Sequence, residues 1–109
     1  MYLILKDNKK LEIKEYKNFI KKLQGLMFKK EKINYIVRLN NCNSIHTFFM
    51  KQNIDVIITD KKNNILYKRK NITKNKVIFP IKNGYYVYEM PEGTIDKINK
   101  FVIYSTKWW

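Results

Sequence analysis

Short apolar runs recur along this chain at intervals of roughly ten residues, separated by clusters of Asn, Lys and Asp. Runs of this length, bounded by residues that tolerate turn conformations, are typical of the strands of a β-rich domain. The Asp- and Asn-rich segment 60–64 predicts a hairpin between two of these strands. The runs that we expect to form strands are 2–5, 35–39, 46–50, 54–59, 65–67, 77–79, 85–90 and 101–104.

One segment has a helical rather than a strand period. Its apolar residues recur at three- and four-residue spacings with lysines between them, and they are Tyr16, Phe19, Ile20 and Leu23. This pattern predicts an amphipathic helix over about 16–24, which Gly25 would end in a left-handed conformation. A short helical turn is expected near 94–99, where Thr94 can cap free backbone donors.

The chain has 109 residues, which is the length of one domain with one modest core. Hydrophobic residues make up 45% of it, too many for a disordered chain. No internal repeat and no Pro/Gly/Ser-rich linker divides it. We therefore predict a single α+β domain over 1–109, mostly an antiparallel sheet curled into a barrel-like shape, with one main helix and a late helical turn.

The net charge of +14 is the strongest compositional bias, and such an excess points toward nucleic acid or an anionic membrane surface. However, the chain holds 21 Lys, 16 Ile and 13 Asn against 2 Arg and no Ala, which is typical of AT-rich coding sequences. Phosphate recognition favours the bidentate arginine fork, and only Arg38 and Arg69 are present. A generally solvated basic surface is therefore favoured over nucleic-acid binding.

A single cysteine cannot form an intramolecular disulfide, so a reducing cytoplasm is the simpler location. The short apolar start at 1–5 lacks the features of a secretory signal. No run approaches the roughly 18 apolar residues of a transmembrane helix. We expect a cytoplasmic protein without a membrane span. Of the two terminal tryptophans, Trp108 and Trp109, we expect at least one to pack against the fold or a partner.

Four segments resemble the motifs of one protein family. They are Gly25-Leu26-Met27-Phe28, the run from Cys42 to Met50, Ile54 to Ile57 leading on to Asp60, and Val87 to Pro91 followed by Gly93-Thr94. Over roughly 12–94 the chain resembles the uncharacterised family known as domain of unknown function 192. It departs from that pattern at Lys21 and Lys22, where the family has an acid and an arginine, and at Asn53, where it has a proline.

The resemblance implies a compact, barrel-like α+β fold and carries no established activity. It also marks residues with a structural role in the family pattern. These are Gly25, Leu26, Met27, Phe28, Met50, Glu89, Pro91, Gly93 and Thr94.

Cys42 and His46 are the only cysteine and the only histidine, and they lie four residues apart. A thiol beside an imidazole is a candidate nucleophile and base, with Asp55 as a third candidate. On one extended strand, however, four residues separate the two Cα atoms by about 13 Å. The pair therefore requires that loop 40–44 fold the thiol back over the imidazole. A loop cysteine without a chemical role is the alternative.

Strand pairing gives a second interpretation of His46. If 51–53 is a hairpin loop, His46 would oppose Ile58 and Phe48 would oppose Val56, so His46 would end a core-facing row. A barrel mouth lined by Phe48, Phe49 and tyrosines could alternatively hold a small molecule or a sugar ring. The candidate ligand-binding residues are therefore His46, Phe48, Phe49 and Asp55.

No metal or cofactor site is predicted. A structural zinc normally needs four ligands, whereas the chain offers one Cys and one His, and three glycines make no phosphate-cradling fingerprint. The leading hypothesis is a small non-enzymatic binding or accessory domain with a protein or small-molecule partner. The alternatives are a hydrolase- or transferase-like enzyme that uses Cys42 with His46, and a basic nucleic-acid-binding domain.

Overall fold

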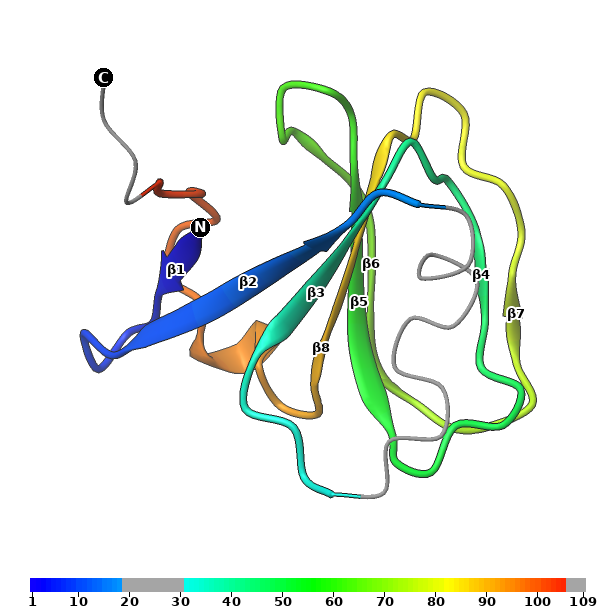
Figure 1. Cartoon of the computed structure of the whole chain (residues 1–109), viewed down its shortest axis with the longest axis horizontal. Helices are drawn as coiled ribbons and strands as arrows, with labels where there is room; N and C mark the ends of the chain where they lie inside the picture. Colours follow the sequence, from blue (N-terminus) through cyan, green and yellow to red (C-terminus); the bar gives the residue numbers. More distant parts are fainter. Residues whose placement is uncertain (19–30, 106–109) are drawn as a thin grey trace.

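The computed structural model describes residues 1–18 and 31–105 (Figure 1). Strand formation follows the apolar runs in most places. The elements are β1 (Tyr2–Ile4), β2 (Lys10–Tyr16), β3 (Ile36–Asn40), β4 (Ile45–His46), β5 (Ile54–Thr59), β6 (Ile65–Ile72), β7 (Val77–Ile78), β8 (Tyr86–Pro91) and the 3₁₀ helix η1 (Ile95–Lys97).

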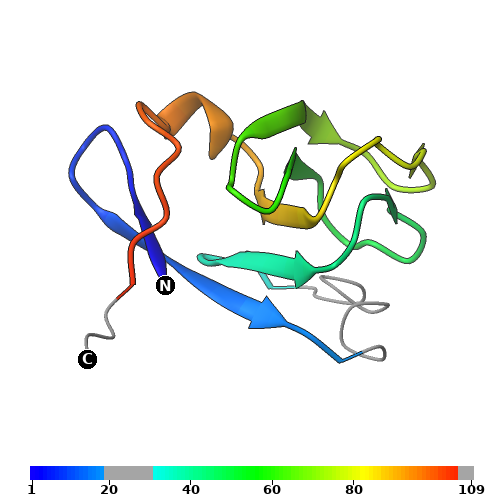
Figure 2. The same cartoon turned by 90° about the horizontal axis from the view of Figure 1, so that it is seen from above.

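Six strands form one sheet in the order β1-β2-β3-β8-β5-β6, while β4 pairs with β7 in a separate two-stranded ribbon. β2 and β3 run parallel, and the other neighbours in the sheet are antiparallel. The sheet curls strongly, as the view in Figure 2 shows. It does not close into a barrel, because β1 and β6 remain as its two edges in the described chain.

The predicted α+β class with a main helix is wrong for the described part of the chain, which is almost entirely β. Tyr16, the first residue of the expected helix over 16–24, belongs to β2 and pairs with Leu39 of β3. A strand forms here because Leu11 and Ile13 alternate with polar residues, which is the two-residue period of a strand, and because Ile13 is buried. Residues 19–24 of that expected helix lie outside the described residues, as do the motif 25–28 and Trp108 and Trp109.

η1 is the sole helical element within residues 1–18 and 31–105, and it falls in the expected range 94–99. The turn before it needs a positive φ at Gly93 (+87°), and Thr94 donates its amide to the Pro91 carbonyl (3.1 Å). These motif residues therefore fix where η1 begins. In the parts of the chain that the structure describes, no helix is long and apolar enough to cross a membrane.

Two apolar clusters pack on the two faces of the sheet, and β5 contributes to both. Ile54, Val56 and Ile58 belong to the first cluster, together with residues of β3, β4 and β7. Ile57 belongs to the second, together with residues of β8 and η1. Because successive side chains of a strand point to opposite faces, the two sides of β5 present different surroundings to any site built on it.

Candidate functional site

A tight turn at 47–50 connects β4 toward β5, and hydrogen bonds and burial anchor both of its ends. Met50 donates its amide to the Thr47 carbonyl (3.2 Å) and buries its side chain in the first cluster. The buried Thr47 hydroxyl donates to the Thr73 carbonyl (2.7 Å) and accepts from the Lys76 amide (2.8 Å). Both ends of the turn are thus anchored, while the two residues at its tip, Phe48 and Phe49, are exposed.

Phe49 occupies a backbone conformation that L residues rarely adopt. Its φ is +63°, and its side chain is 62% exposed. A side chain in this left-handed region is strained by roughly 1–2 kcal/mol, a penalty that asparagine partly escapes. In the described chain, the other non-glycine residues with positive φ are all asparagines: Asn8, Asn41, Asn63, Asn71, Asn75 and Asn83. Phe49 is thus the one described non-glycine residue with a positive φ that is not an asparagine.

Exposed apolar side chains continue from this turn onto β7. The rings of Phe48 and His46 stack with centroids 5.1 Å apart, and His46 pairs directly with Val77 across the β4–β7 ribbon. Val77 is 46% exposed, and Phe79, two residues further on the same extended segment, is 76% exposed. Phe48, Phe49 and Val77 form what we call the aromatic surface, whereas Phe79 continues away from the turn, since Val77 pairs with His46 and Ile78 pairs with Ile45. The sequence pattern indicated Phe48 and Phe49 but not Val77.

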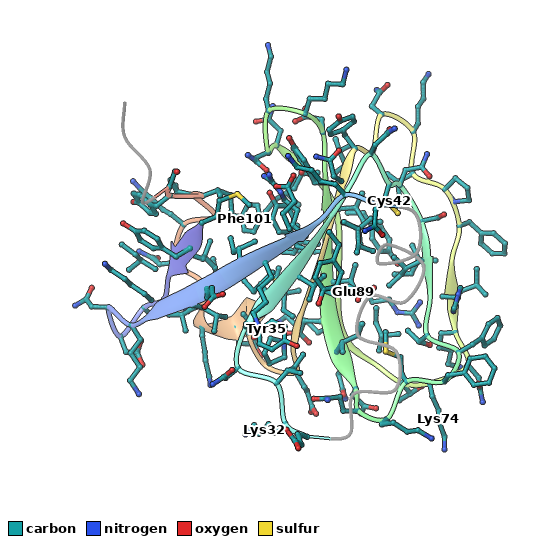
Figure 3. The ribbon with its side chains drawn as sticks, in the orientation of Figure 1. Lys32, Tyr35, Cys42, Lys74, Glu89 and Phe101 are labelled. Carbon is teal, nitrogen blue, oxygen red and sulfur yellow. The ribbon has the colours of Figure 1, made fainter. Side chains whose placement is uncertain are left out.

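The surroundings of the aromatic surface are basic. Lys51, Lys74 and Lys76 are exposed and lie in the segments that build it. The segments 41–54 and 61–88 contain no acidic residue, and Asp55 and Asp60 lie between them. Figure 3 shows Lys74 extending outward at this end of the molecule.

The predicted hairpin between 46–50 and 54–58 is wrong. β4 pairs with β7, and β5 is flanked by β6 and β8. The error arises because Phe49 reverses the chain within 46–50, so this run does not continue as a strand. The His46 ring is therefore half-buried beside Phe48 and does not end a core-facing row of β5. Its Nδ1 accepts a hydrogen bond from the Phe48 amide (3.3 Å).

Cys42 lies at the other end of β4. Its thiol donates to the Ser44 carbonyl (3.2 Å), its amide donates to the Tyr85 carbonyl (2.8 Å), and its side chain packs against the first cluster. The catalytic role of Cys42 with His46 stays a prediction.

Asp55 faces the opposite side of β5 from Cys42. It is 1% exposed, and it accepts the Asn71 amide at Oδ1 (2.8 Å) and the Ile95 amide at Oδ2 (2.9 Å). Both oxygens thus hold β6 and η1 to β5. The sheet lies between this carboxylate and the Cys42 side chain, so the structure does not bring Asp55 and Cys42 together.

Among the described residues, no group of three or more His, Cys, Asp or Glu side chains is placed to hold a metal ion. Glu89, a residue of the family pattern, is buried on β8 between its pairing partners Val37 and Val56. Its charge contributes to raising the pKa of Tyr16, after desolvation by burial and the neighbouring Tyr35.

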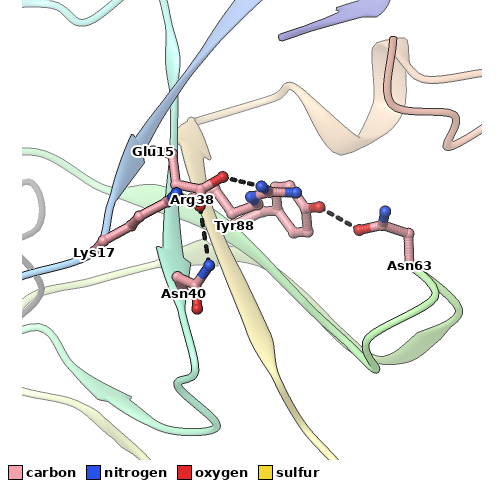
Figure 4. A network of polar contacts seen from close by, with 6 residues as sticks. All are labelled: Glu15, Lys17, Arg38, Asn40, Asn63 and Tyr88. Carbon is pink, nitrogen blue, oxygen red and sulfur yellow. Dashed lines mark hydrogen bonds and ion pairs between the residues drawn. The ribbon is translucent and has the colours of Figure 1, made fainter. Parts of the chain in front are cut away.

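A polar network that the sequence did not indicate crosses the other face of the sheet (Figure 4). Glu15 forms an ion pair with Arg38 and accepts a hydrogen bond from Asn40 (2.9 Å). The Arg38 guanidinium also lies 4.1 Å from the centre of the Tyr86 ring. The residues of this network come from β2, β3 and β8, so it becomes visible only in the folded structure. One of the chain's two arginines, Arg38, is engaged in it.

Tyr88 extends the network toward the β5–β6 hairpin, where its hydroxyl donates to the Asn63 side chain. Burial raises the pKa of Tyr88, and the nearby Arg38 opposes that shift. The phenol therefore keeps the proton that it donates.

A shallow cavity of about 570 Å³ lies at this hairpin end, between 60–64 and 83–85. The Lys61 ammonium lies 5.1 Å from the centre of the Tyr85 ring at its wall. The 47–50 turn leads to the start of β5, whereas this cavity lies past the end of that strand. Tyr85 lines the cavity, and Phe48 and Phe49 do not.

Fold and surface together define a small, strongly basic, almost entirely β domain whose 47–50 turn exposes two consecutive phenylalanines. The chain belongs to the family of uncharacterised ancient conserved regions known as domain of unknown function 192, whose model matches residues 3–100. The UPF0127 protein of Pyrococcus horikoshii is 30% identical over 120 residues, covering 98% of this chain and 99% of that protein. The resemblance seen in the sequence is thereby confirmed.

Two crystal structures are similar in fold. A candidate transcription regulator from Sinorhizobium meliloti has a TM-score of 0.71 at 15% identity, covering 87% of this chain and 81% of that one. A protein of unknown function from Novosphingobium aromaticivorans has a TM-score of 0.64 at 13% identity, covering 77% and 65%. At these identities the likeness concerns the fold alone.

Proposed function

We propose that this chain is a non-enzymatic binding domain and that its binding surface is the aromatic surface. Phe49 carries this proposal. A strained, exposed phenylalanine stands where the same chain elsewhere uses asparagine. Residues held in unfavourable backbone conformations cluster at functional positions.

The placement of the aromatic surface supports a binding role over a packing role. The Thr47 hydroxyl and the buried Met50 side chain anchor the two ends of the turn, while Phe48 and Phe49 lie exposed at its tip. Exposed apolar groups that cluster, rather than lie scattered, mark interaction sites. A rigid support also lowers the entropy lost when such groups bind.

The candidate transcription regulator raises nucleic-acid binding as a rival function. Arg38 is engaged by Glu15 and Tyr86, so Arg69 is left as the exposed arginine of the described chain. A surface that reads nucleic acid normally relies on arginine for bidentate contacts. The aromatic surface is therefore the better supported site.

Replacement of Phe49 by Asn tests the proposal without knowledge of the partner. If the ring serves binding, Phe49→Asn should leave the free energy of unfolding unchanged or raise it by up to about 1 kcal/mol, because strain is relieved. Urea unfolding followed by far-ultraviolet circular dichroism would measure this. A loss above about 1 kcal/mol would mean that the ring supports the fold, and would overturn the proposal.

Phe101→Asn is the matched control. Phe101 makes an edge-to-face contact with the buried Tyr88, with ring centroids 5.0 Å apart. The same chemical change at this packed position should lower the free energy of unfolding by about 2–3 kcal/mol.

A further inference from the structure

We infer that the free edge of β6 binds an extended acidic segment of a partner protein, which adds to the sheet as a further antiparallel strand. This surface is separate from the aromatic surface, and the inference does not rest on the proposed function. It joins three observations: an unpaired sheet edge, a run of basic side chains along it, and two exposed apolar side chains at one end of it.

The two edges of the six-stranded sheet differ in how the chain covers them. At β1, Tyr2 exchanges backbone hydrogen bonds with Tyr104 of the C-terminal segment (both 2.9 Å), and the two rings stack. At the other edge, β6 pairs with β5 alone among residues 1–18 and 31–105. About half of the amide and carbonyl groups of an edge strand point away from its neighbour, so β6 presents them to an added strand.

The side chains of β6 are also open to solvent. All of them from Ile65 to Asn71 are exposed except Tyr67, which is half-buried against the first cluster. The run Lys68-Arg69-Lys70 carries three positive charges. Within the described chain, Lys70 is the member of this run that has an ion-pair partner, the exposed Asp96. Because consecutive side chains point to opposite faces, the charge lies on both faces of the edge.

Charge selects the kind of strand that this edge accepts. A second copy of the chain, paired antiparallel about the basic run, would place Lys68 opposite Arg69 of that copy. Like charges directly opposite each other destabilise a strand pair, so the edge opposes self-association. A strand with acidic residues opposite the basic run forms favourable cross-strand pairs instead.

The order of side chains along β6 sets the order along the partner strand. Ile65 and Leu66 are 43% and 40% exposed at the start of β6, and as consecutive residues they point to opposite faces. In an antiparallel pair, these positions meet the end of the added strand, whereas the basic run meets its beginning. The partner segment therefore has acidic residues followed by β-branched apolar residues, which suit a pleated strand.

A short labelled peptide tests the inference. Its sequence is three glutamates, a threonine and two valines in that order, with a threonine at each end, and fluorescence anisotropy with the full chain would measure its binding. A second peptide has the same side chains but carries N-methyl groups on two adjacent central residues, which blocks both edges of the peptide. It should bind at least about tenfold more weakly, because hydrogen bonds to β6 are lost while every charge remains.

Orientation is tested by a third peptide with the same residues in reverse order. Its valines would meet the basic run in an antiparallel pair, so it should bind at least about threefold more weakly than the first peptide. Amide hydrogen exchange locates the contact. On binding of the first peptide, exchange should slow at every second residue of 65–70, because the amides that point outward gain acceptors.

Matched variants separate this edge from general basicity. Lys68→Gln with Arg69→Gln should weaken binding of the first peptide about fivefold, since two cross-strand charge pairs are lost. Lys6→Gln with Lys9→Gln removes the same charge from exposed positions between β1 and β2, near the opposite edge of the sheet. This control should bind within about twofold of the wild type.

Four results would overturn the inference: no binding of the first peptide, undiminished binding of the methylated peptide, undiminished binding of the reversed peptide, or equal losses in the two double variants. Undiminished binding of the methylated peptide would mean that charge alone holds the peptide and that no strand is added. None of these measurements involves Phe49, so the proposed function is tested separately by the unfolding of Phe49→Asn.

Discussion

Two turns flank β5, and they meet the same backbone requirement with different residues. The turn before the strand has Phe49 at φ +63°, and the turn after it has Asn63 at φ +66°. Asn63 is tied into the fold, since its side chain accepts the Tyr88 hydroxyl. Phe49 points most of its ring into solvent. The comparison therefore sets an asparagine with a bonded side chain at one tip against a largely exposed phenylalanine at the other.

The hydrogen bonds of the two turns differ accordingly. In the hairpin turn, the exposed Asp60 carboxylate accepts the Lys62 and Asn64 amides (both 2.9 Å). In the aromatic turn, at 47–50, the buried Thr47 hydroxyl makes the stabilising hydrogen bonds, to the Thr73 carbonyl and from the Lys76 amide. Stabilising groups are therefore at the surface in one turn and in the core in the other.

The largest expected effect comes from the carboxylate near the aromatic end of β5. Asp55→Asn would place an amide NH₂ against one of the two backbone N–H groups that the carboxylate now accepts. We expect a loss of about 3 kcal/mol in the free energy of unfolding, because a buried donor loses its acceptor along with a charge-assisted bond. Urea unfolding would measure it. A loss below about 1 kcal/mol would contradict the role of Asp55 in joining β6 and η1 to β5.

The support of the aromatic turn should be next in size. Thr47→Val keeps the shape of the side chain but removes the hydroxyl that links Thr73 and Lys76, so we expect a loss of about 2 kcal/mol. Amide hydrogen exchange should also accelerate at Lys76, whose acceptor is removed. Unchanged exchange at Lys76 would show that the turn is not anchored through Thr47.

Replacing the tip residue of each turn by that of the other turn tests the comparison directly. Asn63→Phe would introduce the strain that Phe49 bears and remove the acceptor of the Tyr88 hydroxyl, so we expect a loss of about 2 kcal/mol. Phe49→Asn is expected to lose nothing. Equal effects of the two substitutions on urea unfolding would remove the distinction between the turns.

Local patterns were sufficient to predict much of this fold. The hairpin at 60–64 is confirmed, because Asp60 and the asparagines carry the turn chemistry that their residue types imply. The strand over 54–59 is confirmed with the bounds of β5. Both depend on interactions within a few residues of one another.

The parts that sequence patterns missed depend on distant partners. The parallel pairing of β2 with β3 joins residues 23 positions apart. The apolar alternation in β2 is too short to predict this pairing. The aromatic surface was predicted in part: Phe48 and Phe49 stand together in the sequence, but Val77 joins them only through the β4–β7 ribbon. The strain at Phe49 could not be seen before its φ was known.

The smallest expected effect concerns pH. The pKa of Asp60 is lowered, first by the hydrogen bond from the Asn64 amide and then by the Asn64 side chain. A carboxyl whose pKa is lower in the folded than in the unfolded chain stabilises the fold above its unfolded pKa of about 3.9, and loses that contribution as pH falls through the folded pKa. The stability difference between wild type and Asp60→Asn should therefore be present at neutral pH and shrink on acidification below about pH 4.

Asp60 is partly exposed, so solvent screens its interactions and keeps this effect small. Phe49→Asn changes no ionisable group, so its stability difference from wild type should stay constant over the same pH range. Thermal unfolding at a series of pH values, with both variants beside the wild type, would measure the two differences together. A difference for Asp60→Asn that did not change with pH would mean that the carboxylate charge contributes nothing to the hairpin turn, and that the two turns differ at their tips alone.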